Sequence, residues 1–196
     1  SSVSYTLSAN VEHLYLTGTG NINGAGNERD NFIGGTSGSN ILTGGAGNDN
    51  LAGYGGADTL IGGTGNDSYN VYSSQDLVIE YANEGVDLVK SLVSYTLGAN
   101  LENLTLIGTT SINGAGNELN NTITGNSGNN ILDGGLGNDT LNGAAGNDTY
   151  KWGSASGNDI VNNYHTGGDA DTLQFQNLVQ AAIEFTRSNN DLVCTI

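Results

Sequence analysis

Aspartates recur in this 196-residue chain at the ends of short glycine-rich segments, and they recur nine residues apart. Asp49, Asp58 and Asp67 follow one another at this spacing, and Asp139 and Asp148 repeat it further along. Carboxylate oxygens and the backbone carbonyls of turns are the ligands that a hard cation such as Ca²⁺ prefers. The residue types and their spacing therefore indicate a series of cation sites.

The elements that must position these aspartates are short strands separated by turns. Apolar residues also recur in steps of nine, whereas a helix requires steps of three and four. Three residues centred on each apolar position suit a short strand, and the six glycine-rich residues before them suit a tight turn. The apolar positions are Ile33, Leu42, Leu51, Leu60, Tyr69 and Val78, then Ile123, Leu132, Leu141 and Tyr150.

Two strands and two turns are the least that can close a coil, so residue i should stack on residue i+18. Neighbouring parallel strands are about 4.8 Å apart, which is roughly twice a Ca²⁺–oxygen distance of about 2.4 Å. One ion therefore fits between two stacked carboxylates, which without it repel each other by roughly 1 kcal/mol in water and by more in a lower dielectric. The stacked pairs expected are Asp49/Asp67, Asp58/Asp76, Asp67/Asp87, Asp139/Asp159 and Asp148/Asp171.

Some turns carry asparagine where the others carry aspartate. A pair with one carboxylate has less negative charge, and charge count tunes calcium affinity, so we expect weaker or vacant sites there. These mixed pairs are Asn31/Asp49, Asn40/Asp58, Asn121/Asp139 and Asn130/Asp148.

The nine-residue unit Gly-Gly-x-Gly-x-Asp-x-apolar-x is clear in residues 44–70 and 134–150 and degenerate in 26–43 and 116–133. It resembles the nonapeptide repeat of the hemolysin-type RTX family. The resemblance implies an all-β, right-handed parallel β-roll with several Ca²⁺ ions held between neighbouring turns along each edge. The implied ligands are Asp49, Asp58, Asp67, Asp76, Asp87, Asp139, Asp148, Asp159 and Asp171 by side chain, Gly44, Gly45, Gly47, Gly62, Gly63, Gly65, Gly134, Gly135 and Gly137 by backbone, and more weakly Asn40 and Asn130.

A longer repeat divides the chain into modules. Residues 22–28 recur as 112–118, an offset of 90, and the first module holds one extra nonapeptide. We expect one roll module at 1–90, a second at 91–173, and the start of a capping β segment, apparently truncated, at 174–196. Residues 92–107 lack the nonapeptide and are expected to form strands that join or cap the rolls.

Composition excludes several functions. A formal charge of −16 repels nucleic acid and anionic membranes and attracts cations. The single cysteine, Cys194, cannot form an intramolecular disulfide, and we expect it to be buried and inert. His13 and His165 have no metal-ligand spacing and are expected on the surface. No membrane-inserting segment, nucleotide loop or catalytic constellation is expected, and the chain is predicted not to be an enzyme.

The resemblance favours a calcium-binding segment of a larger secreted bacterial protein, at the cell surface or outside the cell. Such a segment would fold in calcium after type I secretion and would serve a structural or display role. Two alternatives remain open. One is an adhesive or ligand-binding module for polysaccharide or ice, although the Thr and Asn rows are broken by Ala46, Ala57 and Leu136. The other is the accessory repeat region of an extracellular calcium-dependent enzyme.

Overall fold

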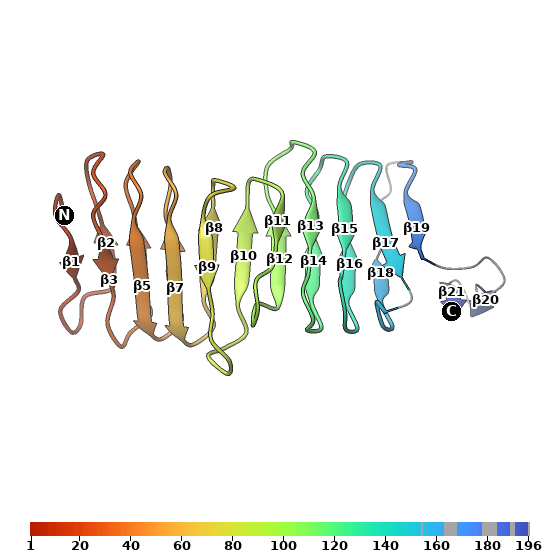
Figure 1. Cartoon of the computed structure of the whole chain (residues 1–196), viewed down its shortest axis with the longest axis horizontal. Coiled ribbons are helices and arrows are strands. Elements are labelled where there is room, and N and C mark those ends of the chain that lie inside the picture. Colours follow the sequence, from red (N-terminus) through yellow and green to blue (C-terminus); the bar gives the residue numbers. More distant parts are fainter. Residues whose placement is uncertain (154, 163–167, 178–183, 189–190, 196) are drawn as a thin grey trace.

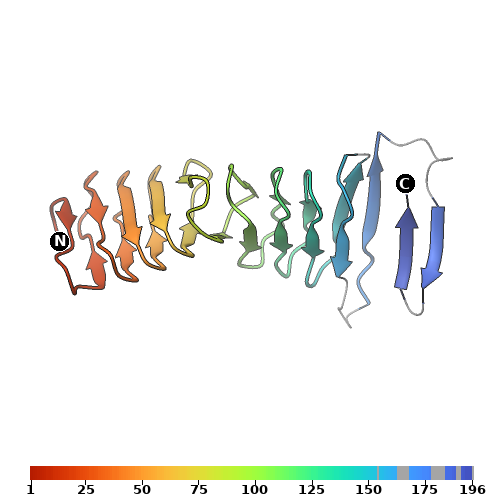
Figure 2. The same cartoon turned by 90° about the horizontal axis from the view of Figure 1, so that it is seen from below.

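The computed structural model describes residues 1–153, 155–162, 168–177, 184–188 and 191–195. Its coils are stacked in chain order along the longest axis of the molecule, with the N-terminus at one end (Figure 1). Each coil contributes one strand to each of two faces, as the view from below also shows (Figure 2). The described residues contain no helix, so the expected parallel β-roll is confirmed. None of them forms a helix that is long and apolar enough to span a membrane.

One face is a single sheet of nine parallel strands that runs without a break through both halves of the chain. In spatial order these are β2 (His13–Tyr15), β4 (Phe32–Gly34), β6 (Asn50–Ala52), β8 (Ser68–Val71), β10 (Leu88–Ser91), β12 (Asn103–Leu106), β14 (Thr122–Thr124), β16 (Thr140–Asn142) and β18 (Ile160–Asn162). Residues 92–107, which lack the nonapeptide, thus supply β12 to the middle of this sheet.

The opposite face is divided into two parallel sheets of five strands each. The first holds β1 (Tyr5–Thr6), β3 (Gly24–Ala25), β5 (Ile41–Ala46), β7 (Thr59–Thr64) and β9 (Leu77–Ile79). The second holds β11 (Tyr95–Thr96), β13 (Gly114–Ala115), β15 (Ile131–Asp133), β17 (Thr149–Gly153) and β19 (Thr172–Gln176). An antiparallel pair, β20 (Glu184–Ser188) and β21 (Asp191–Thr195), follows. The expectations for His165 and for the Cys194 side chain fall outside what the structure describes.

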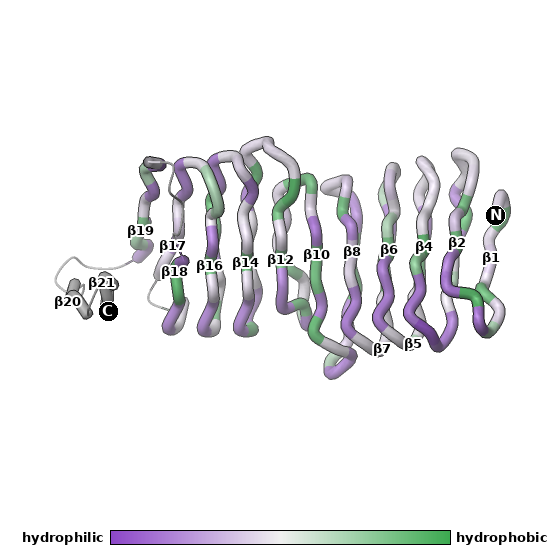
Figure 3. Tube along the Cα trace, turned by 180° about the vertical axis from the view of Figure 1, so that it is seen from behind, coloured by the Kyte–Doolittle hydropathy of each residue, from purple (hydrophilic) through white to green (hydrophobic). Residues whose placement is uncertain are grey.

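The apolar residues of the nine-residue period form the core between the two faces. Leu42 pairs with Leu60, and Leu51 pairs with Tyr69, each across 18 residues as expected. All four side chains are 0% exposed, and full burial of such a side chain contributes roughly 1.5–3 kcal/mol. Hydrophobic and hydrophilic residues alternate along the coils with no long apolar run (Figure 3). The core is therefore a thin ladder that places the turns at fixed heights along both edges.

Candidate metal centre

Acidic and amide residues form two rows, and each of these residues directly precedes a strand. The first row borders the nine-stranded sheet and the second borders the two five-stranded sheets. The first row consists of Asn31, Asp49, Asp67, Asp87, Glu102, Asn121, Asp139 and Asp159. The second row consists of Asn40, Asp58, Asp76, Asn130, Asp148 and Asp171. The parallel register of the strands places these residues above one another, coil by coil.

The structure brings together all five aspartate pairs that the sequence predicts. In each pair the backbone N–H of the earlier aspartate donates a hydrogen bond to Oδ1 of the later one. The N–O distances are 2.6 Å for Asp49/Asp67, 3.1 Å for Asp58/Asp76, 2.7 Å for Asp67/Asp87, 3.0 Å for Asp139/Asp159 and 2.7 Å for Asp148/Asp171. One oxygen of each later carboxylate is therefore held by the backbone of the coil before it.

The second oxygen is different in four of the aspartates. Oδ2 of Asp49, Asp58, Asp67 and Asp139 is buried and has no hydrogen-bond partner. These residues are only 1–2% exposed. A buried ionised carboxylate without a partner is costly, and such groups in proteins are paired or bind metals. The four oxygens thus fit a bound cation, and a chain with four Lys+Arg against 20 Asp+Glu has few side-chain cations to supply instead.

The glycines allow close packing of the turns in two ways. A Cβ on Gly44 would lie 2.2 Å from Oδ2 of Asp49, and a Cβ on Gly62 would lie 2.0 Å from Oδ2 of Asp67. Gly134 stands in the same relation to Asp139, at 2.1 Å. The remaining predicted glycines have a positive φ, between 94° and 132°, and a Cβ on them would meet the backbone of the preceding coil. They are Gly45, Gly47, Gly63, Gly65, Gly135 and Gly137.

The asparagine turns are closed by their own hydrogen bonds. In the Asn40 turn, Oδ1 accepts the Thr36 backbone N–H at 2.7 Å, and Nδ2 donates to the Ile22 carbonyl of the preceding coil at 2.6 Å. Asn130 does the same with Asn126 and Ile112, at 2.9 and 2.5 Å. The amide NH₂ thus supplies a donor that a carboxylate lacks.

Backbone conformation separates the two kinds of turn. The fourth residue before the aspartate has a positive φ in five turns, at Gly45, Tyr54, Gly63, Gly135 and Ala144. The corresponding residues of the asparagine turns, Asn27, Thr36, Asn117 and Asn126, do not, and each donates its N–H to the asparagine Oδ1. Tyr54 and Ala144 adopt the left-handed region at a cost of roughly 1–2 kcal/mol each. The aspartate turns therefore hold a conformation that local hydrogen bonding does not provide.

The pairs are not all alike. Asp76 has both oxygens engaged, because Oδ2 accepts the backbone N–H groups of Tyr72 and Ser73, each at 3.0 Å. In the first row, Asp87 donates its backbone N–H to Oε2 of Glu102 at 2.9 Å, so the row continues into the second half of the chain. Asp159 and Asp171 are only partly buried. Burial and partner shortage are thus greatest at Asp49, Asp58, Asp67 and Asp139.

Two acidic residues of the site were missed by the sequence analysis, Glu80 and Glu102. Glu102 occupies the aspartate position of the coil that lacks the nonapeptide. Glu80 follows Ile79, which pairs with Ile61, so it occupies the position of Gly62 one coil earlier. The 18-residue series Gly44, Gly62, Glu80 is a signal that could have identified it.

Burial raises the pKa of the aspartates, because it disfavours the charged form. The pKa of Asp49, Asp58 and Asp139 rises to about 6, and neighbouring carboxylates add to the effect. The pKa of Asp67 rises to about 7, first through burial and then through Asp49, Asp87 and Glu84. Protons and cations therefore compete for the same oxygens near neutral pH.

The calcium-free chain is expected to fold more readily as the pH falls from about 8 to about 5. An unfolded aspartate has a pKa of about 3.9, so in this window the folded chain binds more protons than the unfolded chain, and acid favours folding. Calcium affinity is expected to fall over the same window, because protons must leave before the ion binds. Far-UV circular dichroism of calcium-stripped chain at both pH values measures the folded fraction. A lower folded fraction at the acidic pH would contradict the assignment.

Comparison with known proteins agrees with this geometry. No curated protein matches the chain significantly. Residues 34–69 and 115–150, however, match the family model described as the RTX calcium-binding nonapeptide repeat, with four copies. Each matched segment contains turns of both rows. Residues 34–69 include Asp49, Asp58 and Asp67, and residues 115–150 include Asp139 and Asp148. The repeats of this family are structural calcium-binding elements rather than catalytic ones. Both halves of the chain thus contain segments that match the RTX calcium-binding nonapeptide repeat.

Proposed function

We propose that this calcium-binding β-roll is a folding module of a secreted protein, one that becomes ordered when it meets extracellular calcium and then serves a structural or display role. The observation that carries the proposal is the set of buried Oδ2 atoms without a partner at Asp49, Asp58, Asp67 and Asp139. Their desolvation opposes folding of the ion-free chain. A cation bound between the coils would attract these carboxylates and so offset the free-energy cost of burying them.

The energetic effect of several sites is large enough to switch the fold. A ligand that binds only the native state stabilises it by RT ln(1 + [L]/Kd), which is about 2.7 kcal/mol per site at 100 times Kd. Net stabilities of domains are only about 5–15 kcal/mol. At millimolar calcium, the binding free energy of a few sites therefore exceeds a deficit of a few kcal/mol in the folding stability of the ion-free chain. At submicromolar cytosolic calcium the same sites contribute almost nothing. The unfolded chain, with its charge of −16, would repel itself and stay extended during export.

The ligands proposed for the ions are the aspartates of the two rows and turn carbonyls beside the glycines of the nine-residue repeat. Asp49/Asp67, Asp67/Asp87 and Asp139/Asp159 serve the first row, and Asp58/Asp76 and Asp148/Asp171 serve the second. We propose no calcium ligand role for the amides of Asn40 and Asn130, because their oxygens already accept backbone N–H groups. The residue types alone predict weaker sites at these two positions.

Binding of an external polysaccharide is a second candidate, and a group of aromatic side chains favours it. Tyr15 and Phe32 lie on the outside of β2 and β4 with ring centroids 5.1 Å apart, and Tyr54 stacks on Tyr72 at 5.6 Å. A Cβ on Gly34 would lie 3.2–3.4 Å from the rings of Tyr54, Phe32 and Tyr15, so these rings converge over it. Tyr15 is 56% exposed and Tyr54 43% exposed. Aromatic faces with polar tips suit sugar rings.

Calorimetric titration of calcium-stripped chain tests the proposed function. CaCl₂ at neutral pH is expected to bind at more than one site per chain, and MgCl₂ is expected to bind much more weakly. Magnesium demands near-ideal octahedral geometry and gives up its water reluctantly, whereas calcium accepts six to eight oxygens in flexible arrangements. Absence of calcium binding at millimolar concentration would refute the function. Titration of neutral dextran into the calcium-loaded chain tests the second candidate. Polysaccharide binding would release or absorb heat, and Tyr15→Ala would abolish that heat.

A further inference from the structure

The turn between β9 and β10 departs from the nonapeptide at the position of its first glycine. Gly44 and Gly62 occupy this position in the two preceding coils, and a Cβ there would collide with the aspartate of the same turn. Glu80 occupies it in the next coil. Asp87 follows Asp67 after 20 residues rather than 18, so this turn is longer and can accommodate a side chain.

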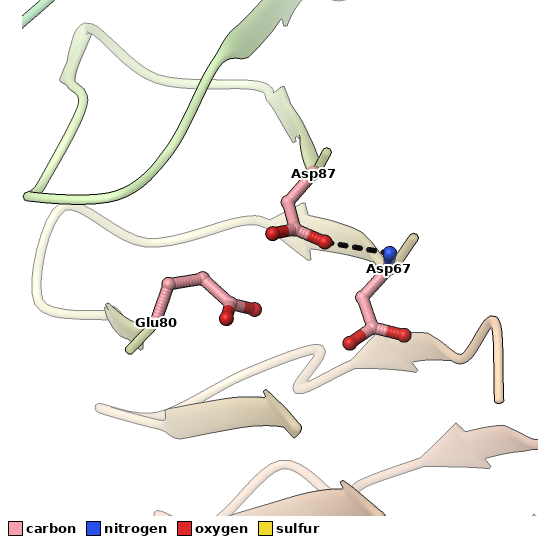
Figure 4. Close-up of side chains that lie close together, drawn as sticks. All are labelled: Asp67, Glu80 and Asp87. Carbon is pink, nitrogen blue, oxygen red and sulfur yellow. Dashed lines mark hydrogen bonds between the residues drawn. The ribbon is translucent and has the colours of Figure 1, made fainter. Parts of the chain in front are cut away.

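The Glu80 side chain points from this position toward the aspartate row (Figure 4). One carboxylate oxygen from each of Asp67, Glu80 and Asp87 lies within 4.8 Å of the others. The three residues are 2%, 6% and 1% exposed, respectively. The Tyr69 hydroxyl donates a hydrogen bond to Oε1 of Glu80. Oε2 of Glu80 and Oδ2 of Asp67 are buried without a hydrogen-bond partner.

A single calcium ion satisfies this arrangement. Ca²⁺–oxygen distances of about 2.3–2.6 Å allow ligand oxygens on opposite sides of one ion to be about 5 Å apart. The three oxygens, all within 4.8 Å of one another, are therefore about as close together as the ligands of a single ion. Three buried carboxylates so close together repel strongly unless a cation or protons compensate them.

We propose that Asp67, Glu80 and Asp87 form one calcium site of three carboxylates, distinct in composition from the repeat's paired-aspartate sites, and that it is the tightest site of the chain. The inference rests on the proposed function, since it assumes that the aspartate row binds calcium. More negative charge in the ligand set raises calcium affinity. Glu80 is the ligand that the nonapeptide does not provide.

The position of this site gives it a structural consequence. Asp67 precedes β8 and Asp87 precedes β10, both in the nine-stranded sheet. On the opposite face, the first five-stranded sheet ends at β9, and the second begins at β11. Among the sheets described, only the nine-stranded one therefore connects the two halves of the roll by strand pairing. A calcium ion in the three-carboxylate site would link the coil of β8 to the coil of β10 at this connection.

The second half of the chain offers an internal comparison. Asp139 and Asp159 are also 20 residues apart in the same row. Trp152 follows Lys151, which pairs with Asp133, so it occupies the first-glycine position next to Gly134. A tryptophan there supplies no carboxylate. The Asp139/Asp159 site therefore has the same turn length without the third acidic ligand.

Glu80→Gln, which keeps the shape and removes the charge, tests the proposal in the full chain. Calorimetric titration with CaCl₂ at neutral pH is expected to show that the tightest site is weakened at least about tenfold. Glu28→Gln is the matched control, because Glu28 is exposed and the charge change is the same. Glu80→Asp retains the charge with a shorter side chain and is expected to weaken the same site less. Comparison of the two variants therefore separates the loss of a ligand charge from misfolding of the variant chain.

Two outcomes would overturn different claims. If the wild-type chain bound no calcium, the proposed function would be wrong. If the wild-type chain bound calcium and both Glu80 variants gave the wild-type isotherm, only the three-carboxylate site would be wrong. A weakened tightest site in Glu80→Gln, together with an unchanged isotherm for Glu28→Gln, supports it.

Discussion

Asp67→Asn is expected to weaken two neighbouring calcium sites at once while leaving the ion-free chain no less stable. Oδ1 of Asp67 accepts the Asp49 N–H at 2.6 Å, and its own N–H donates to Oδ1 of Asp87 at 2.7 Å, so Asp67 belongs to two pairs. The substitution removes one carboxylate from each pair, so that Asp49 remains in the first pair and Asp87 in the second. In the ion-free chain it also removes a buried charge, and Asn40 shows that an amide in such a row can be satisfied by the backbone.

Calorimetry with CaCl₂ measures this effect. The heat of two ions should be lost, or both sites should be weakened by at least about tenfold. At 100 times Kd, loss of two sites corresponds to roughly 5 kcal/mol of calcium-dependent stability. Glu118→Gln is the control, because Glu118 is exposed and lies outside the two rows. Loss of a single ion, or an isotherm like that of the wild type, would show that the carboxylates do not act as shared neighbours.

Gly65→Ala is expected to destabilise the calcium-bound roll by about 3 kcal/mol or more. Gly65 has φ = 132°, a conformation that is essentially restricted to glycine and costs other residues roughly 1–3 kcal/mol. A Cβ on Gly65 would also lie 1.9 Å from the Gly47 carbonyl oxygen, so the coils would have to separate. A Cβ on Gly85 would meet the Gly65 carbonyl oxygen in the same way in the next coil. A side chain at Gly65 or Gly85 would therefore push the neighbouring coils apart.

Urea unfolding in saturating calcium, and the calcium concentration at half-folding, both report this change. The variant should unfold at lower urea and need more calcium to fold. Gly20→Ala provides the comparison, since Gly20 has no positive φ and its Cβ would have only Ile22 nearby, at 3.9 Å. Equal stability of the two variants would indicate that the turns do not pack as described.

The sequence predicts the regular part of the roll because one nine-residue unit specifies strand, turn and stacking together. Leu42 over Leu60 and Leu51 over Tyr69 follow from the period alone. The aspartate pairs follow from the same register, including those with longer turns, such as Asp67 and Asp87. That calcium binds to these particular residues stays a prediction.

The centre of the chain could not be derived from the period. Tyr69 pairs with Val89 after 20 residues, Val89 with Leu104 after 15, and Leu104 with Ile123 after 19. A changing coil length leaves several registers open until the strands are paired in space. Glu102 therefore enters the aspartate row only through three-dimensional stacking. Glu80 lies on the 18-residue series of Gly44 and Gly62, but its approach to Asp67 and Asp87 is seen only in the structure. The closed asparagine turns were missed for a related reason, because their hydrogen bonds span neighbouring coils.

In the proposed function, calcium supplies the free energy that the thin core and the buried carboxylates lack. The most direct measurement is far-UV circular dichroism of the full chain at neutral pH in excess chelator, followed by titration with calcium and, separately, with magnesium. We expect a largely unfolded spectrum in chelator, a cooperative transition to a strand-rich spectrum in calcium, and little change in magnesium. A strand-rich spectrum in chelator, unchanged by added calcium, would contradict the proposed function.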